Sequence, residues 1–261
     1  SGVWPEHRLA EYADNELEAV AESILALKEA GVGFRQQAVL CTGNDKLARF
    51  GAGLESLGIP VLHLGSIFER PEVKDLLALL SMLIDRRPMG LVRTATLDDF
   101  AMDLSDTGYI VAAMAQEGAP TPFWSASPPA LKALSPPGRQ SLDRLAEALS
   151  GFDQTSQPWN VLVAILLDRT RIAAKIATTP TIGARAKGIA IWQLMNFVRS
   201  QPPGRGLPIM RLLSRIRRLV RLADDRDLRQ LPASAQGLDA VRLMTVHGSK
   251  GLEFTAVHFP G

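Results

Sequence analysis

The residues Val241-Arg-Leu-Met-Thr-Val-His-Gly-Ser-Lys-Gly-Leu-Glu-Phe254 decide how this chain folds. The run from Val241 to Val246 has the alternating pattern of a strand, and β-branched residues are frequent in it. A polar loop, His247 to Gly251, follows, and a second strand-like run extends from Phe254 to Phe259. Open α/β sheets bind ligands at the carboxyl ends of their strands. A strand that ends in polar side chains between two glycines therefore predicts a binding site.

The first 85 residues have an alternating order of helices and strands. A helical pattern over Leu9 to Ala30 precedes a short apolar strand, Ala38 to Cys41. A second helical pattern, Lys46 to Leu57, precedes a second apolar strand, Val61 to Leu64. This order favours a parallel sheet with right-handed crossovers, and uniformly apolar strands are typical of parallel sheets that are buried on both faces. We therefore expect an α/β fold.

Residues 86–238 have a different character, because they contain most of the prolines and no convincing strand pattern. Helical patterns lie at residues 98–104, 107–116, 127–134, 138–149, 159–167, 184–200 and 207–228. In the simplest topology, the last section of the chain rejoins the first sheet. We therefore expect a discontinuous α/β domain, residues 1–85 and 239–261, with an all-helical domain inserted at residues 86–238.

The composition excludes several classes of protein. The 261 residues are 46% hydrophobic and 21% charged, as in globular proteins, and the net charge of +2 means that nucleic acid could bind only through local patches. A single cysteine, Cys41, excludes an intramolecular disulfide and fits a reducing compartment. No signal peptide and no membrane-spanning run is visible, so we expect a cytoplasmic protein. The start at Ser1-Gly2, without methionine, suggests a piece of a longer protein.

The loop from Thr245 to Lys250 offers groups that suit a phosphate: backbone N–H groups, a hydroxyl, an imidazole and an ammonium. An ordinary polar turn is the alternative, and composition alone does not separate the two. Ser66 and Arg70 follow the second predicted strand, so they are expected at the same edge of the sheet. For Arg70, the alternative role is a salt bridge with Glu69 or Glu72.

The chain lacks the motifs for nucleotide hydrolysis. Gly248-Ser-Lys-Gly251 is not a phosphate-binding P-loop, because the required earlier glycine and the Ser or Thr after the lysine are missing. No strand ends in the Asp-Glu pair that would hold a magnesium ion beside a nucleotide. The four histidines show no metal-ligand spacing, and we expect no metal site.

Seven arginines lie on a helical pattern over residues 209–230. Three of them, Arg211, Arg215 and Arg218, fall on one face of the helix. This face is either solvated and partly neutralised by the aspartates of residues 224–227, or it binds duplex DNA or a partner. We favour the solvated face from the sequence.

The stretch from Val241 to Phe254 resembles motif V of the UvrD/Rep/PcrA-type superfamily 1 DNA helicases. It keeps the order Leu, any residue, Thr, any residue, His, two small residues, and then Lys-Gly-Leu-Glu-Phe. The segment Gly65-Ser-Ile-Phe-Glu-Arg-Pro-Glu-Val-Lys-Asp75 resembles the Phe-Glu-Arg signature of the same domain. The two motifs occur in the order found in the family, and a helical insertion of family-like size separates them.

The resemblance implies that the two ends of the chain form the second RecA-like motor domain, called 2A. Residues 86–238 would then correspond to the helical 2B domain, which touches duplex DNA or partners. The resemblance also implies that Gly251 and Glu253 lie on the nucleotide side, with Glu253 near the ribose. It places Arg70, Thr245 and His247 at single-stranded DNA, and it implies that Lys250 and Gly251 shape the loop. Ser66 and Lys250 are polar residues expected at the same edge of the sheet. The predicted DNA-binding residues are therefore Ser66, Arg70, Thr245, His247 and Lys250.

We therefore expect the C-terminal part of an ATP-dependent DNA helicase, which moves along single-stranded DNA as two RecA-like domains open and close. The parent protein would use ATP and Mg²⁺, whereas this chain alone should neither bind them tightly nor hydrolyse ATP. The expected partners are single-stranded DNA, a duplex junction, the missing N-terminal RecA-like domain and a protein that binds residues 86–238, but no membrane. The alternative is a helical protein-interaction or DNA-binding regulatory module whose motor loops are not catalytic.

Overall fold

The computed structural model describes residue 6 and residues 13–63, 66–84, 89–115, 132–222 and 237–261. Its internal contacts divide the chain into two compact units. The first contains the described residues up to Arg70, residues 180–189 and residues 237–261. The second contains the described residues of 71–179 and residues 190–222.

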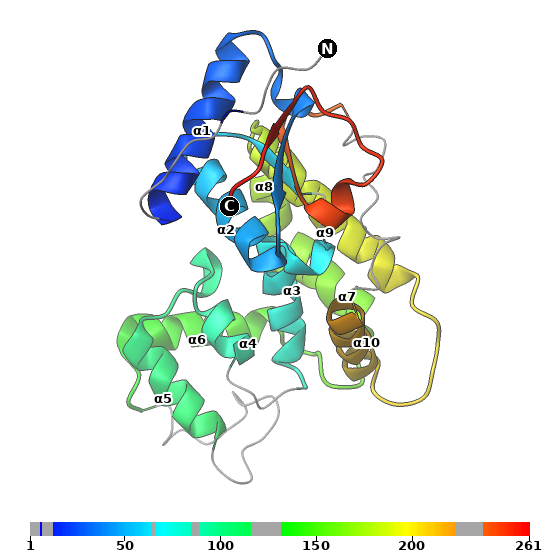
Figure 1. Ribbon diagram of the computed structural model, residues 1–261. Coiled ribbons are helices and arrows are strands. Elements are labelled where there is room, and N and C mark those ends of the chain that lie inside the picture. Colours follow the sequence, from blue (N-terminus) through cyan, green and yellow to red (C-terminus); the bar gives the residue numbers. More distant parts are fainter. Residues whose placement is uncertain (1–5, 7–12, 64–65, 85–88, 116–131, 223–236) are drawn as a thin grey trace. The chain divides into compact units, whose positions relative to one another are not determined.

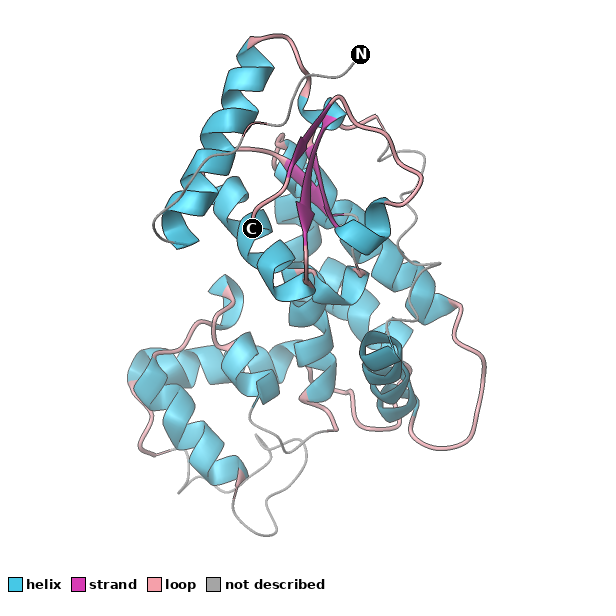
Figure 2. Cartoon of the chain, viewed as in Figure 1, coloured by secondary structure: helices cyan, strands magenta, loops and turns pink. Residues whose placement is uncertain are grey.

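A four-stranded parallel sheet forms the centre of the first unit (Figure 2). Its order is β2 (Val61–His63), β3 (Val241–Thr245), β1 (Gln37–Cys41) and β4 (Ala256–His258). All three pairings are parallel. Since β3 lies between β2 and β1, the last part of the chain occupies the middle of the sheet that the first part begins. The predicted α/β class, and the return of the last section to the first sheet, are confirmed.

Helices α1 (Ala13–Glu29) and α2 (Asn44–Ser56) cover one face of this sheet. In α2, Leu47, Phe50 and Leu54 recur at helical spacing, and none of these side chains is exposed. Burial of each such side chain contributes roughly 1.5–3 kcal/mol of hydrophobic free energy. The strand residues in the same cluster are Val39, Cys41, Val61, Val241 and Leu243.

The other face of the sheet is covered by the beginning of α9 (Ile182–Arg199). Ile182 and Ala186 pack against Leu62 and Ala240. Successive side chains of a strand point to opposite faces of the sheet. Leu62 therefore packs on the face opposite to that of its neighbours in β2, in a different apolar cluster. The small Ala186 and Ala240 side chains allow a close approach of helix to sheet.

The contacts divide the chain differently from the expected domain boundaries at 85/86 and 238/239. Residues 71–84, expected with the sheet, group with the helices, and residues 180–189, expected in the insertion, group with the sheet. Apolar periodicity reveals that a segment is a helix, but it does not reveal which of two cores buries that helix. The units defined by contacts and the predicted domains are different divisions of the chain, and the domain boundaries stay a prediction.

All the secondary structure that the second unit shows in its described residues is helical (Figure 1). Its α-helices are α3 (Pro71–Ser81), α4 (Met89–Thr94), α5 (Leu104–Met114), α6 (Pro136–Ala148), α7 (Pro158–Val163), α8 (Ile172–Thr178), the later part of α9 and α10 (Pro208–Leu222). A π-helical segment, Ala164–Arg169, continues α7. Among the helices that the structure describes, none is long and apolar enough to cross a membrane.

The short helices of this unit were the hardest to predict. The sequence patterns did not indicate α4 or α8, which have only 6 and 7 residues, because two turns are too few to display a periodicity. The segment predicted at residues 98–104 forms only a short 3-10 helix, Asp98–Phe100. Most of the helix predicted at residues 127–134 lies outside the described residues.

The start of α6 shows how local sequence fixes a helix. Ser135 is the N-cap, and its Oγ accepts a hydrogen bond from the Gly138 N–H at 3.1 Å. Two prolines, Pro136 and Pro137, follow in the first turn, where their missing N–H groups cost nothing. The Ser135 N–H and hydroxyl donate in turn to the Asp106 carboxylate, at 2.8 Å and 2.5 Å. One serine thus caps α6 and connects it to α5.

Candidate nucleic-acid site at the carboxyl edge of the sheet

Two chain segments that carry predicted site residues follow neighbouring parallel strands. β2 ends at His63 and precedes Ser66–Arg70, while β3 ends at Thr245 and continues into a 3-10 helix, Val246–Ser249. His63 pairs with Leu243, two residues before the end of β3. Because the strands are parallel, both segments follow the carboxyl edge of the sheet. This edge is where open α/β sheets bind ligands.

Thr245 closes the turn that follows β3. Its Oγ1 accepts a hydrogen bond from the Gly248 N–H at 3.2 Å, and Ser249 Oγ donates to the Val246 carbonyl at 2.8 Å. A hydroxyl has one proton to donate in addition to its two lone pairs, so Thr245 can still donate to a phosphate. The polar-turn and phosphate-binding interpretations of this loop are therefore compatible, because the same threonine can serve both.

Three predicted side chains of this loop extend into solvent. His247, Lys250 and Glu253 are all exposed, and Lys250 is the C-cap of the 3-10 helix. Gly251 has a φ of +85°, in the left-handed region that favours glycine. A Cβ at Gly251 would meet no atom within 4 Å, so the backbone conformation, rather than lack of space, requires glycine here.

The segment after β2 is built into the fold more firmly. Ser66 Oγ accepts a hydrogen bond from the Phe68 N–H at 3.3 Å, and Ile67 and Phe68 are buried. Ser66 is only 4% exposed and Arg70 only 8%. The side chains of these two residues are therefore packed into the loop and help to hold its structure. Lys250 is exposed and is the more accessible of the predicted cations.

A third strand end, that of β1, lies at the same edge and carries none of the predicted site residues. Cys41, the last residue of β1, pairs with Thr245, and the 3-10 helix Val246–Ser249 contacts β1. Thr42 follows and is exposed. An apolar strand followed by Thr-Gly-Asn was the available signal, but the sequence does not reveal that β1 and β3 are neighbours.

Burial raises the pKa of the Cys41 thiol to about 11 despite the opposing charge of Lys46, so the thiol stays protonated at neutral pH.

The opposite edge of the sheet has a structural role. Asp239, just before β3, forms an ion pair with Lys28 at 2.6 Å and accepts a hydrogen bond from the Arg35 N–H at 3.0 Å. Burial alone would raise the pKa of Asp239, but these two partners outweigh it, and the pKa lies below its ordinary value. This carboxylate therefore anchors the chain where it enters the middle strand.

The two residues predicted at a nucleotide, Gly251 and Glu253, lie close together in the chain after β3. The exposed carboxylate of Glu253 can accept hydrogen bonds from ribose hydroxyls, and Gly251 leaves room beside it. Within the part of the chain that the structure describes, no group of three His, Cys, Asp or Glu residues could hold a metal ion. Contact of Gly251 and Glu253 with a nucleotide therefore stays a prediction.

Residues 4–100 match the family model of the UvrD-like helicase C-terminal domain. This range includes β1, α2, β2 and the segment from Ser66 to Arg70, whereas the loop after β3 lies outside it. No curated protein matches the sequence. Residues 4–100 are therefore similar to the C-terminal domain of UvrD-like helicases.

Proposed function

We propose that the carboxyl edge of the sheet binds the sugar–phosphate backbone of single-stranded DNA, as part of an ATP-dependent DNA helicase. One observation carries this proposal. Two neighbouring parallel strands, β2 and β3, precede the two polar segments Ser66–Arg70 and Thr245–Lys250, which follow one edge of the sheet. The first of these segments lies in the region that matches UvrD-type helicases.

The polar groups of this edge are suited to phosphate oxygens. His247 and Lys250 can donate from solvent-exposed positions, and Thr245 can donate through its hydroxyl. Arg70 is mostly buried, with 8% of its surface exposed, and its planar guanidinium can bind a phosphate only through that exposed part. All of these groups recognise the backbone and not the bases. Binding would therefore be independent of DNA sequence, as a protein that moves along a strand requires.

In this proposal the first unit is a RecA-like motor domain, and the helical residues correspond to an inserted 2B-like domain. ATP and Mg²⁺ would supply the energy for movement, held mainly by a separate P-loop domain. Glu253 would orient the ribose from this side. The contribution of the chain itself is to hold the DNA strand at one edge of its sheet while the other motor domain approaches or withdraws.

Fluorescence anisotropy of labelled oligo-dT with the purified chain tests this proposal. We expect His247→Ala and Lys250→Ala each to weaken binding about five- to tenfold, since each removes one contact to a phosphate. Both side chains are exposed, so the thermal unfolding midpoint should not change. Binding should also weaken as salt is added. For about three phosphate contacts, a plot of the logarithm of the association constant against the logarithm of salt concentration should have a slope of about −2.

Arg35→Ala is the matched control, because it removes a cation from an exposed position just before β1, at the amino edge of the same sheet. Its effect on affinity should be less than about twofold. The proposal fails if both site variants bind as tightly as the unaltered chain. It also fails if Arg35→Ala weakens binding as much as they do.

A further inference from the structure

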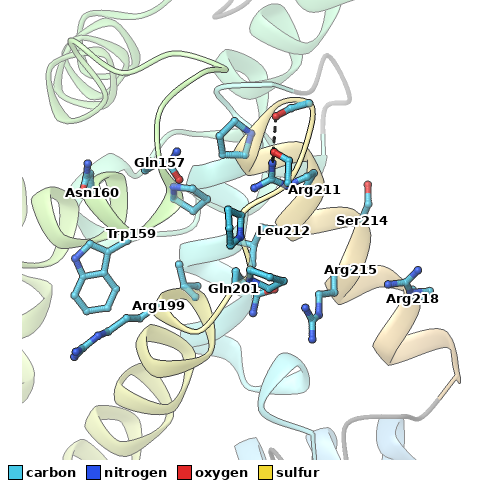
Figure 3. Close-up of a pocket in the computed structure, with 17 residues that line it drawn as sticks. Gln157, Trp159, Asn160, Arg199, Gln201, Arg211, Leu212, Ser214, Arg215 and Arg218 are labelled. Carbon is cyan, nitrogen blue, oxygen red and sulfur yellow. Dashed lines mark hydrogen bonds between the residues drawn. The ribbon is translucent and has the colours of Figure 1, made fainter.

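A groove of about 1130 Å³ lies within the second unit (Figure 3). The first turn of α7, the end of α9, residues 201–204, Gly206 and one face of α10 line it. Trp159 and Arg199 lie on one side of the groove and the arginines of α10 on the other (Figure 3). Its volume exceeds the range of roughly 300–1,000 Å³ that is typical of small-molecule sites. The groove is therefore large enough for a segment of another chain.

Every charged residue that lines this groove, in the part of the chain that the structure describes, is an arginine. The lining residues include Arg199, Arg211, Arg215 and Arg218 and no acidic residue. The three arginines of α10 span two turns of the helix, or roughly 10 Å. The sequence favoured a plain solvated face for these arginines, but the structure places them along a groove. The aspartates of residues 224–227 lie outside the described residues.

Two of these arginines are held in position. Arg211 Nη1 donates a hydrogen bond to the Gly204 carbonyl, which connects α10 to the loop before it. The guanidinium of Arg215 lies 5.8 Å from the centre of the Phe197 ring. Arg199 and Arg218 are exposed at the sides of the groove. The groove therefore combines positioned cations with cations that can adjust to a ligand.

Much of the remaining surface of the groove is apolar. It includes Pro158, Pro202, Pro203 and Pro208, together with Leu212 and Trp159. Prolines have no N–H group, so these positions cannot donate backbone hydrogen bonds to phosphates. An apolar surface bordered by arginines, with an indole ring beside it, is typical of protein interfaces, where Trp and Arg contribute much of the binding energy.

We propose that this groove binds an acidic segment of a partner protein. Carboxylates of the segment pair with Arg199, Arg215 and Arg218, and one of its apolar side chains packs against Trp159 and the prolines. Charge complementarity favours an acidic ligand. Duplex DNA is also acidic, but its surface is convex and carries no side chain that could fill an apolar hollow. This inference does not rest on the proposed DNA site, which uses residues of the other unit.

A fluorescein-labelled peptide of about ten residues, containing aspartate, glutamate, leucine and phenylalanine, is the probe for this groove. We expect it to bind the full chain and to bind about tenfold more weakly to the Arg199→Ala/Arg218→Ala double variant. Trp159→Ala should also weaken binding. Arg221→Ala is the matched control, because it removes an exposed charge from the same helix outside the groove, and it should leave the affinity unchanged.

Four outcomes would overturn the proposal: no binding of the peptide, equal binding of its Asn/Gln counterpart, an equal loss in Arg221→Ala, or no loss in the double variant. If oligo-dT or a DNA hairpin binds with the same dependence on Arg199 and Arg218 while the peptide does not bind, the groove is a nucleic-acid surface and the proposal is wrong. His247→Ala separates this test from that of the DNA site. It should weaken binding of oligo-dT but leave peptide binding unchanged.

Discussion

Individual residues of the candidate DNA site differ in how deeply their side chains are buried. His247 and Lys250 are exposed, whereas Ser66 and Arg70 are almost wholly buried. Thr245 is intermediate, because its hydroxyl oxygen closes the turn that it begins. Substitution of the exposed pair should change ligand binding alone. Substitution of the buried pair should change stability as well, so the exposed residues give the clearer test of function.

Gly251 allows a prediction at this scale. Its φ of +85° is unfavourable for residues with a side chain, and no neighbouring atom restricts the space around it. We expect Gly251→Ala to lower the free energy of unfolding by about 1 kcal/mol, through backbone strain alone. Urea denaturation measures this change. Gly251→Asn should cost less, because asparagine tolerates the left-handed region, and equal stability of the alanine variant would contradict the explanation.

Secondary-structure elements were predictable to different degrees. The pattern from Val241 to Val246 predicted β3 almost to its observed bounds, and the apolar runs predicted β1 and β2. The order of the strands was not predictable, because β1 and β3 pair across about two hundred residues of chain. The groove of α10 was not predictable either. The sequence showed which face carries the arginines, but not that α7 and the loop before α10 form the rest of a hollow.

The junction between α5 and α6 yields a prediction at the scale of elements. Ser135 caps α6 and donates two hydrogen bonds to the buried Asp106. Ser135→Ala removes the cap and one of the bonds to the carboxylate, so we expect a loss of about 2 kcal/mol in the free energy of unfolding. Thermal or urea unfolding would show it. Ser135→Thr keeps the hydroxyl and should recover most of the loss.

The ion pair at the entrance to β3 predicts a dependence on pH. The pKa of Asp239 is lower in the folded chain than in the unfolded chain, so its contribution is present above the unfolded pKa of about 3.9 and disappears as pH falls through the folded value. Both partners are more than a third exposed, so the contribution should not exceed about 1 kcal/mol. Asp239→Asn should therefore destabilise the chain more at pH 7 than at pH 3. An equal effect at both pH values would contradict this account.

At the scale of the whole molecule, charge is nearly balanced but unevenly distributed. The net charge is +2, yet the groove of α10 is lined by four arginines, and the loop after β3 presents Lys250. The two surfaces belong to different compact units and have different chemistry. Donors for a phosphate backbone follow the strand ends, whereas cations in the helical unit border an apolar groove. We therefore expect separate ligands for the two surfaces.

The fold of the whole molecule was predictable only in part. The sequence predicted the α/β class and the return of the last section to the sheet, because both follow from local patterns and from the order of elements. It did not predict where the compact units divide, because residues 71–84 and 180–189 could have been buried in either core. The residues of the DNA site were proposed from a resemblance. The structure adds that the segments carrying them follow neighbouring strands.

Hydrogen–deuterium exchange with and without saturating oligo-dT tests the central claim most directly. If the carboxyl edge of the sheet holds the DNA strand, the amides of residues 246–251 and 67–70 should exchange more slowly in the presence of DNA. Residues 34–37, at the amino edge, should be unaffected. Unchanged exchange in both loops, or slowing concentrated at residues 34–37, would contradict the assignment of this edge to DNA.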